Sequence, residues 1–204
     1  MSRGATARLF VAVDPPAQVR EGLVEWAREA VADWSSWAPR RPRRPLRAPR
    51  VLQPEAVHLT LCFLGSRPVG EISALGAAVE ALAEGAAELS VGAPLWLPPR
   101  RPHALAVEIR DRSGALSELQ AGLSATLSHL SGWEPERRRF RPHITLVRMR
   151  AGSVPTPAGE RPLLAATPQL RFTPEAVVLY RSMPGPGGST YDPLATSALG
   201  RVAG

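Results

Sequence analysis

The stretch VHLTLCFLG, from Val57 to Gly65, is typical of a β-strand with two unlike faces. Successive side chains of a strand point to opposite faces. One predicted face carries groups capable of hydrogen bonding: His58, Thr60 and Cys62. The other predicted face is entirely apolar: Leu59, Leu61 and Phe63. Taken alone, such a strand is explained by a hydrogen-bonded histidine at the edge of a core, and chance matches to short motifs are common.

A second copy of the pattern changes that interpretation. HITL, from His143 to Leu146, differs from HLTL, from His58 to Leu61, by one apolar residue. Each copy lies on a strand-like run and follows a segment with helical periodicity. A weak internal repeat of about half the chain predicts two related lobes, each contributing one strand to a shared cleft. A core histidine explains one His-x-Thr strand but not two.

The rest of the chain mixes strand and helix patterns without regular alternation. Helical spacing of apolar residues predicts helices over about 16–34, within 69–87 and over about 113–130. Strands are expected over the following ranges: 8–14, 57–65, 89–97, 103–109, 139–150, 163–172 and 176–183. This order predicts an α+β fold with antiparallel sheets, arranged as two pseudo-symmetric lobes with the active site in the cleft between them.

Length and composition indicate one domain. The 204 residues suffice for a single two-lobed domain over 1–204, interrupted by a Pro/Arg-rich loop insertion at 35–50. No apolar run is long enough to span a membrane, and the N-terminus lacks the pattern of a signal peptide. The one cysteine fits a reducing compartment, so we expect a cytoplasmic protein. The four histidines show no metal-ligand spacing, so we expect no structural zinc.

The charge of the chain favours an anionic partner. The net charge is +7, and arginine supplies all of the cationic side chains. A basic protein is predisposed to bind polyanions, and the planar guanidinium group of arginine suits phosphate. The loop at 35–50 could hold phosphate, although a solvated surface loop is the simpler explanation. Charge alone indicates a phosphate or nucleic-acid ligand without identifying it.

Two histidines and two threonines on facing strands suit phosphoester cleavage. Histidine titrates near neutral pH, so one imidazole can act as general base while the other acts as general acid. A threonine two residues along the same face lies roughly 7 Å away. Its hydroxyl can donate to a phosphoryl oxygen and stabilise charge in the transition state. A nucleophilic triad fits less well, because neither histidine has an acidic neighbour in sequence and Thr60 and Thr145 lie in strands.

The paired motifs HLTLCFLG and PHITLVR resemble those of the two-histidine (2H) phosphoesterases. Within that family the chain is similar to the bacterial and archaeal RNA 2′,3′-cyclic phosphodiesterases, also called 2′-5′ RNA ligases. Further stretches support the resemblance: RLFVAVDPP near the N-terminus, and LYRS and YDPL near the C-terminus. The likeness runs from about residue 8 to about residue 199.

The resemblance implies a bilobal α+β fold and a reaction. That reaction is metal-independent hydrolysis of a terminal 2′,3′-cyclic phosphate to a 2′-phosphate, with no cofactor. His58 matches the family's proton donor and His143 its proton acceptor, while Thr60 and Thr145 match the residues that hold the phosphoryl oxygens. Arg148 matches an arginine expected near the phosphate or an adjacent nucleotide. The implied partner is RNA or a nucleotide with a 2′,3′-cyclic phosphate end, and we expect a monomer that does not bind membranes.

Other functions use the same four residues. The substrate could be a 2′-5′-linked oligonucleotide or a small cyclic nucleotide phosphate. A catalytically silent RNA-binding protein is a further alternative, although binding alone does not require two titratable groups. We expect RNA ligation only as a side activity, because water at high concentration favours hydrolysis.

The chain also departs from the family pattern. The 35–50 segment is longer than expected, and Cys62 replaces a small apolar residue, where we expect it to pack beside the site without acting as a nucleophile. His103 and His129 match no motif.

Overall fold

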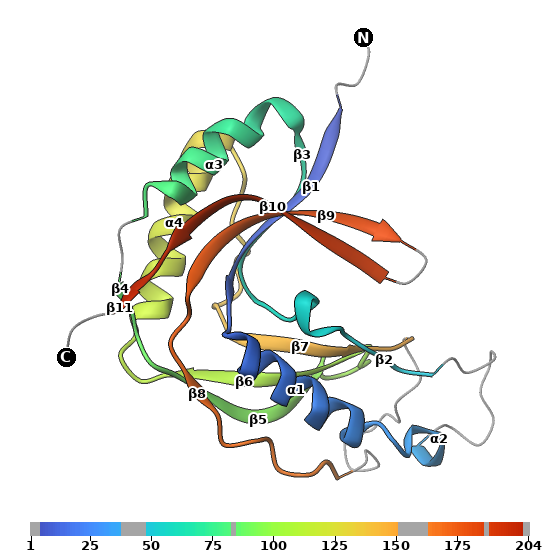
Figure 1. The fold of residues 1–204 in the computed structure, drawn as a ribbon. Helices are drawn as coiled ribbons and strands as arrows, with labels where there is room; N and C mark the ends of the chain where they lie inside the picture. Colours follow the sequence, from blue (N-terminus) through green and yellow to red (C-terminus); the bar gives the residue numbers. More distant parts are fainter. Residues whose placement is uncertain (1–4, 38–47, 83–84, 151–162, 186–187, 202–204) are drawn as a thin grey trace.

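The computed structural model describes residues 5–37, 48–82, 85–150, 163–185 and 188–201. Over these residues the chain forms one large curled sheet with helices packed against it (Figure 1). The strands are β1 (Thr6–Asp14), β2 (Arg50–Val51), β3 (Leu59–Pro68), β4 (Gly85–Ala86), β5 (Leu89–Leu97), β6 (Ala104–Asp111), β7 (His143–Arg148), β8 (Arg171–Phe172), β9 (Ala176–Gly185), β10 (Gly188–Ala198) and β11 (Gly200–Arg201). The helices are α1 (Ala17–Ala30), α2 (Trp34–Trp37), α3 (Ile72–Glu80) and α4 (Ala115–Ser131), with 3₁₀ turns η1 (Pro54–Ala56) and η2 (Val69–Glu71).

The large sheet joins two halves through its central strands. Its order is β10-β9-β1-β3-β7-β6-β5-β8, with β2 paired to β7. Every neighbouring pair of this sheet is antiparallel. The halves meet where Leu59 of β3 pairs with Ile144 of β7. The predicted α+β class with antiparallel pairing is therefore confirmed.

The two halves repeat one strand–helix–strand unit. β1, α1 and β3 form the first copy, and β6, α4 and β7 form the second. In each copy the two strands pair directly with each other. Each helix contacts the last strand of the other copy, α1 on β7 and α4 on β3. These contacts join the two halves. The repeated unit agrees with the internal repeat that the HLTL and HITL sequences predict.

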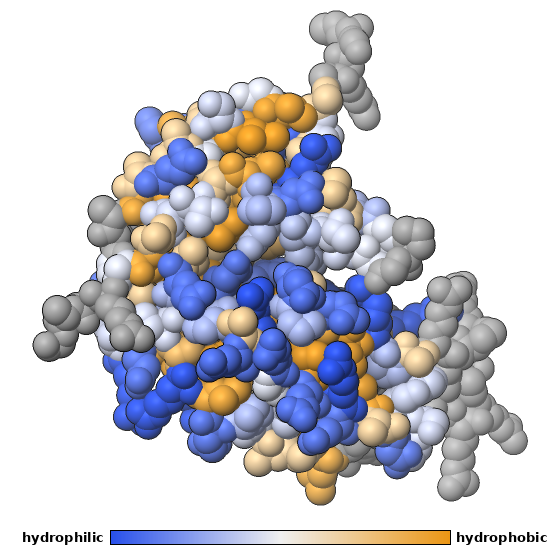
Figure 2. All heavy atoms as spheres, viewed as in Figure 1, coloured by the Kyte–Doolittle hydropathy of each residue, from blue (hydrophilic) through white to orange (hydrophobic). Residues whose placement is uncertain are grey.

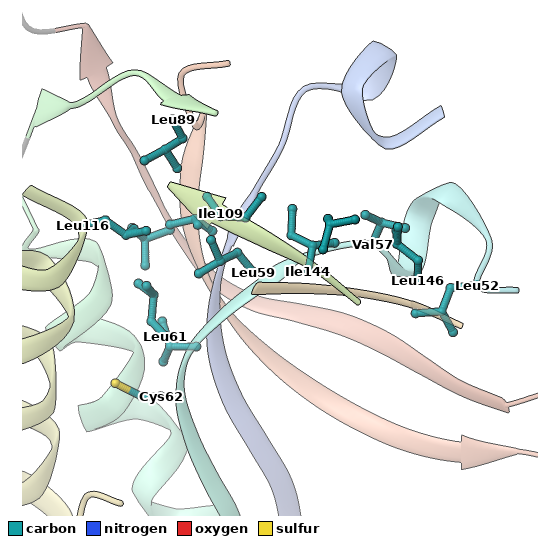
Figure 3. Close-up of a cluster of buried hydrophobic side chains, with 14 of the residues drawn as sticks. Leu52, Val57, Leu59, Leu61, Cys62, Leu89, Ile109, Leu116, Ile144 and Leu146 are labelled. Carbon is teal, nitrogen blue, oxygen red and sulfur yellow. The ribbon is translucent and has the colours of Figure 1, made fainter. Parts of the chain in front are cut away.

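The hydrophobic core lies between the sheet and the helices. Leu59 and Ile144 are 0% exposed and lie together in the buried cluster of Figure 3. Amphipathic α1 contributes one apolar face: Val19, Leu23, Val24, Trp26 and Ala27. Removing such side chains from water stabilises the fold by about 25 cal/mol for each Å² of apolar area buried.

Local signals explain where α4 starts and stops. Its first turn is anchored by the carboxylate of Asp111, which accepts hydrogen bonds from the backbone N–H groups of Gly114 and Leu116. These bonds satisfy donors that a helix N-terminus leaves without partners. The helix ends at Gly132, whose φ of 60° is the left-handed conformation that favours glycine.

Two expectations about the C-terminal strands are wrong. The range 163–172 contains strand only at Arg171–Phe172, and Leu163 is fully exposed. Conversely, the eleven-residue strand β10 was not expected from the sequence. Its sequence GSTYDPLATSA is polar and contains a proline, which the edge of a sheet tolerates. The predicted loop at 35–50 begins with α2 and ends at β2, and its central residues 38–47 lie outside the described residues.

The surface has a hollow on one side. Figure 2 shows an indentation on the side where, in Figure 1, the β9–β10 hairpin lies above β2 and β7. Hydrophilic residues gather on the visible face around α1 (Figure 2). Within the described part of the chain, no helix is long and apolar enough to cross a membrane.

Candidate active site

A β-bulge in β3 decides which side chains share a face with the first histidine. Thr60 lies opposite Ala12 of β1, but Cys62 lies opposite the adjacent Val11, so Leu61 is an extra residue in the ladder. Such a bulge reverses the alternation of side chains. The prediction that Cys62 shares the face of His58 and Thr60 is therefore wrong.

Cys62 belongs to the core instead of the site. Its side chain is 2% exposed and its thiol lies 3.2 Å from the hydroxyl of Ser124 on α4. Burial raises the pKa of this thiol to about 11. A neutral, enclosed thiol is a poor nucleophile, which agrees with the expectation that Cys62 does not react. Its expected position beside the site is corrected by the structure.

β7 contains the same bulge at the matching position. Thr145 lies opposite Ala106 of β6, and Val147 lies opposite Leu105, so Leu146 is the extra residue. Because the alternation is reversed, Val147 is buried and Arg148 turns to the face of His143 and Thr145. The fifth residue after each histidine, Phe63 in β3 and Arg148 in β7, thus reaches the site face through the same local irregularity.

The pairing of Leu59 with Ile144 brings the four predicted catalytic residues together. In an antiparallel register centred on this pair, His58 lies beside Thr145 and Thr60 lies beside His143. Both apolar partners point into the core, so the polar neighbours point to the opposite face. All four polar side chains are half-buried. The structure thus places one histidine and one threonine from each half on one shared surface.

Each histidine is oriented by a backbone carbonyl. Nδ1 of His58 lies 2.9 Å from the carbonyl oxygen of Ala56, and Nδ1 of His143 lies 2.8 Å from that of Arg141. A carbonyl oxygen can only accept, so Nδ1 carries the proton in both rings. Nε2 is then the nitrogen that accepts a proton in a neutral imidazole or donates one in an imidazolium.

Aromatic rings enclose His58. Phe10 stacks on the imidazole at 4.8 Å between centroids, Tyr191 meets it edge-on at 5.0 Å, and Tyr180 lies at 6.3 Å. Burial lowers the pKa of His58 to about 4, while the hydrogen bond to Ala56 opposes this shift. The nearby charges of Arg148 and His143 lower the pKa further. His58 is therefore neutral near neutral pH before an anion binds.

Two carboxylates reach the site through strand pairing rather than sequence proximity. Glu108 of β6 lies directly opposite His143, and it binds the guanidinium of Arg110 at 3.0 Å. Asp14 at the end of β1 accepts a 2.6 Å hydrogen bond from the hydroxyl of Tyr180. Burial raises the pKa of Asp14, although the Tyr180 hydrogen bond acts in the opposite direction. Because carbonyls occupy both Nδ1 atoms, neither acid forms a histidine–carboxylate pair of the triad type.

The side of the site near His143 is basic. Arg148 lies opposite Arg50 in the β2–β7 pair and opposite Ala104 in the β6–β7 pair. On the other side, Phe63 is 41% exposed and the guanidinium of Arg8 lies 4.9 Å from the centre of its ring. Arg148 was predicted from the sequence as a site residue and Phe63 was not, although both occupy the same position in the repeated motif.

The two remaining histidines do not belong to the His-x-Thr motifs. His129 is exposed in the last turn of α4, and His103 is exposed just before β6. Among the described residues there is no group of three or more histidine, cysteine, aspartate or glutamate side chains that could hold a metal ion.

Comparisons with known proteins agree with this geometry. No model of a known protein family matches the chain. It is 32% identical to the RNA 2′,3′-cyclic phosphodiesterase of Thermus thermophilus, over 94% of this chain and 90% of the relative, and 30% identical to that of Escherichia coli, over 94% and 96%. The crystal structure of E. coli LigT complexed with 3′-AMP matches with a TM-score of 0.73 and 25% identity, covering 96% of this chain and 99% of that one.

A curled antiparallel sheet whose two central strands each carry a His-x-Thr motif defines the class of the two-histidine phosphoesterases. The similarity to the relatives extends over nearly the whole length of both chains. Within that class the chain belongs to the RNA 2′,3′-cyclic phosphodiesterase family.

Proposed function

We propose that this protein hydrolyses the 2′,3′-cyclic phosphate at the end of an RNA chain to a 2′-phosphomonoester. The observation that carries the proposal is the symmetric arrangement around Leu59 and Ile144. It offers two imidazoles whose Nδ1 atoms are fixed, with a threonine beside each. The curated relatives named RNA 2′,3′-cyclic phosphodiesterase support the same activity.

In the proposed reaction the two histidines have separate roles. Nε2 of His143 accepts a proton from water as the water oxygen attacks phosphorus. The bond between phosphorus and O3′ breaks, and O3′ takes a proton from Nε2 of His58. The products are a 2′-phosphomonoester and a free 3′-hydroxyl, so one water molecule is consumed in total. Thr60 and Thr145 donate hydrogen bonds to the non-bridging oxygens.

The acid role of His58 requires it to gain a proton when substrate binds. Its pKa of about 4 leaves the free imidazole neutral. A phosphate anion nearby favours the charged form of histidine and raises the pKa.

Arg148 carries a fixed positive charge on the same face and stabilises the negative charge that develops on the phosphoryl oxygens. The exposed ring of Phe63 offers a surface on which the terminal base stacks.

The proposal is tested with a short RNA that ends in a 2′,3′-cyclic phosphate, incubated in EDTA. Mass spectrometry and sensitivity to phosphatase and periodate identify the product end. A 2′-phosphate made by the wild type, and not by His58→Ala or His143→Ala, is the expected result. Failure to hydrolyse this RNA, with turnover of 2′-5′-linked or small cyclic substrates instead, would replace the proposed substrate. Complete loss of rate in EDTA would contradict a metal-independent reaction.

A second experiment separates acid from base. A p-nitrophenyl phosphodiester has a leaving group that departs without protonation, so the general acid contributes little to its cleavage. We expect His58→Ala to lose much less activity on this ester than on RNA, while His143→Ala loses activity on both. If His143→Ala retained activity on this ester and His58→Ala lost it, the assigned acid and base roles would be reversed.

The four catalytic residues come from one chain, so we propose that a monomer suffices for activity. Light scattering coupled to size exclusion, at the concentration of the assay, tests this. A cytoplasmic location stays a prediction that fractionation of cells can check.

A further inference from the structure

A second arginine lies beside Arg148 in the described structure. Arg50 of β2 pairs directly with Arg148 of β7. Residues directly opposite each other in an antiparallel pair point to the same face, with Cβ atoms about 5 Å apart. Because the bulge at Leu146 turns Arg148 to the histidine face, Arg50 shares that face.

The two guanidinium groups extend in different directions. Arg148 lies close enough to His58 for its charge to lower the pKa of that histidine. Arg50 instead packs against Gly188, the first residue of β10 in the other half, where a Cβ atom would overlap its guanidinium. Gly188 also has a φ of 119°, which residues with a side chain rarely adopt. The Arg50 guanidinium therefore reaches from β2 to the first residue of β10 in the other half.

We propose that Arg50 binds the phosphodiester on the 5′ side of the terminal nucleotide, one phosphate away from the reacting one. This inference rests on the proposed function, because it assigns the path of the RNA chain away from the histidines. A planar guanidinium can make two parallel hydrogen bonds to a phosphate, which fixes orientation as well as charge. With Arg148 at the reacting phosphate and Arg50 at the next, the protein favours an RNA chain over a mononucleotide.

The test compares two substrates that differ in that phosphate. One is a dinucleotide with a 2′,3′-cyclic phosphate end, and the other is a nucleoside 2′,3′-cyclic phosphate without a 5′-phosphate. We expect Arg50→Gln to lower the ratio of kcat/KM for the dinucleotide over the nucleoside about tenfold, as for loss of a charged hydrogen bond. The matched control is Arg171→Gln. Arg171 lies on β8, three strands from β7, and forms an ion pair with Glu88. This variant should leave the ratio unchanged.

Salt dependence provides a second readout. In the His143→Ala background, the affinity for the dinucleotide is measured between low and high salt. Each contact to a phosphate of a single strand contributes about −0.7 to the slope of log affinity against log salt. Arg50→Gln should reduce the magnitude of the slope by about 0.7, and Arg50→Lys should retain the slope while losing part of the kcat/KM ratio. Thermal unfolding of both variants checks that they fold.

Three results decide the matter. An unchanged ratio and slope in Arg50→Gln would overturn the proposal. Equal losses on both substrates would also overturn it, because Arg50 would then act on the reacting phosphate. If the wild type hydrolyses neither substrate, the proposed function fails. The same salt slope measured on both ligands then still reports whether Arg50 contacts the extra phosphate, because only the dinucleotide should lose slope in Arg50→Gln.

Discussion

The two halves of the active site have the same backbone and different surroundings. Both motifs have the same order: a histidine, an apolar residue, a threonine, a leucine in the bulge, a buried residue, and an exposed residue five positions after the histidine. Both histidines bind the carbonyl two residues earlier. Around His58, however, the neighbours are the rings of Phe10, Tyr180 and Tyr191. Around His143 they are charged: Glu108, Arg148 and, beyond Arg148, Arg50.

This difference shows how one repeated motif can place two imidazoles in unlike environments. Each histidine is held by the same backbone contact, and burial lowers the pKa of His58. Aromatic burial keeps His58 neutral until an anion arrives. On the other side, Arg148 and Arg50 carry the positive charges to which the proposal assigns phosphate binding. The proposed acid role of His58 therefore requires a bound phosphate anion to raise its pKa.

The largest expected effect comes from removing either imidazole. His58→Ala and His143→Ala should each reduce kcat on cyclic-phosphate RNA by about 10²–10⁴-fold, as expected for loss of general acid–base catalysis. Stopped-time assays with circular dichroism as a folding check measure this. Near-normal turnover in either variant would show that the two halves do not both take part.

The surroundings of His58 should also make stability depend on pH. Its pKa is about 4 in the folded protein and 6.5 ordinarily, so between these values only the unfolded chain binds the proton. Stability is therefore lost as pH falls from 6.5 through 4, by about 3 kcal/mol from this group. Urea unfolding at pH 7 and pH 4 should show a smaller acid loss for His58→Gln than for the wild type.

His129→Gln is the matched control for that experiment, because His129 is exposed on α4. It should keep the acid loss of the wild type. An equal loss in His58→Gln and the wild type would mean that burial of His58 has no energetic consequence.

The residues five positions after the two histidines, Phe63 and Arg148, should contribute unequally to turnover and to substrate binding. Arg148→Ala removes a charge from the reacting phosphate and should lower kcat about 10²-fold. Phe63→Leu removes a stacking surface and should cost about tenfold in kcat/KM, with most of the loss in KM. Phe63→Trp retains a ring and serves as its control. A larger loss from Phe63→Leu than from Arg148→Ala would contradict this division between chemistry and binding.

The smallest effect isolates the aromatic enclosure. Tyr191→Leu removes the ring that meets His58 edge-on and admits water, so the pKa of His58 should rise by about one unit, or about 1.4 kcal/mol. NMR titration of the imidazole measures it. Tyr180→Phe keeps its ring and loses only the hydroxyl bound to Asp14, so it should shift the pKa less. An unchanged His58 pKa in Tyr191→Leu would show that the Tyr191 ring is not a cause of the low pKa.

The sequence by itself determined the α+β class and the family, and it singled out the two histidines and two threonines that the structure brings together. The four residues could be predicted because the His-x-Thr motif is local and occurs twice. The strands that carry them could be predicted because the alternation of apolar residues depends only on neighbours in sequence. The edge strand β10 escaped prediction because its residues lack strict alternation.

Only the tertiary structure decided which side chains surround that quartet. The bulges at Leu61 and Leu146 sent Cys62 into the core and brought Phe63 and Arg148 to the site face. Strand pairing placed Phe10, Tyr180 and Glu108 beside residues distant in sequence. Alternation predicts a face only while the ladder is regular, and cross-strand neighbours depend on register, so neither could be read from the order of residues along the chain.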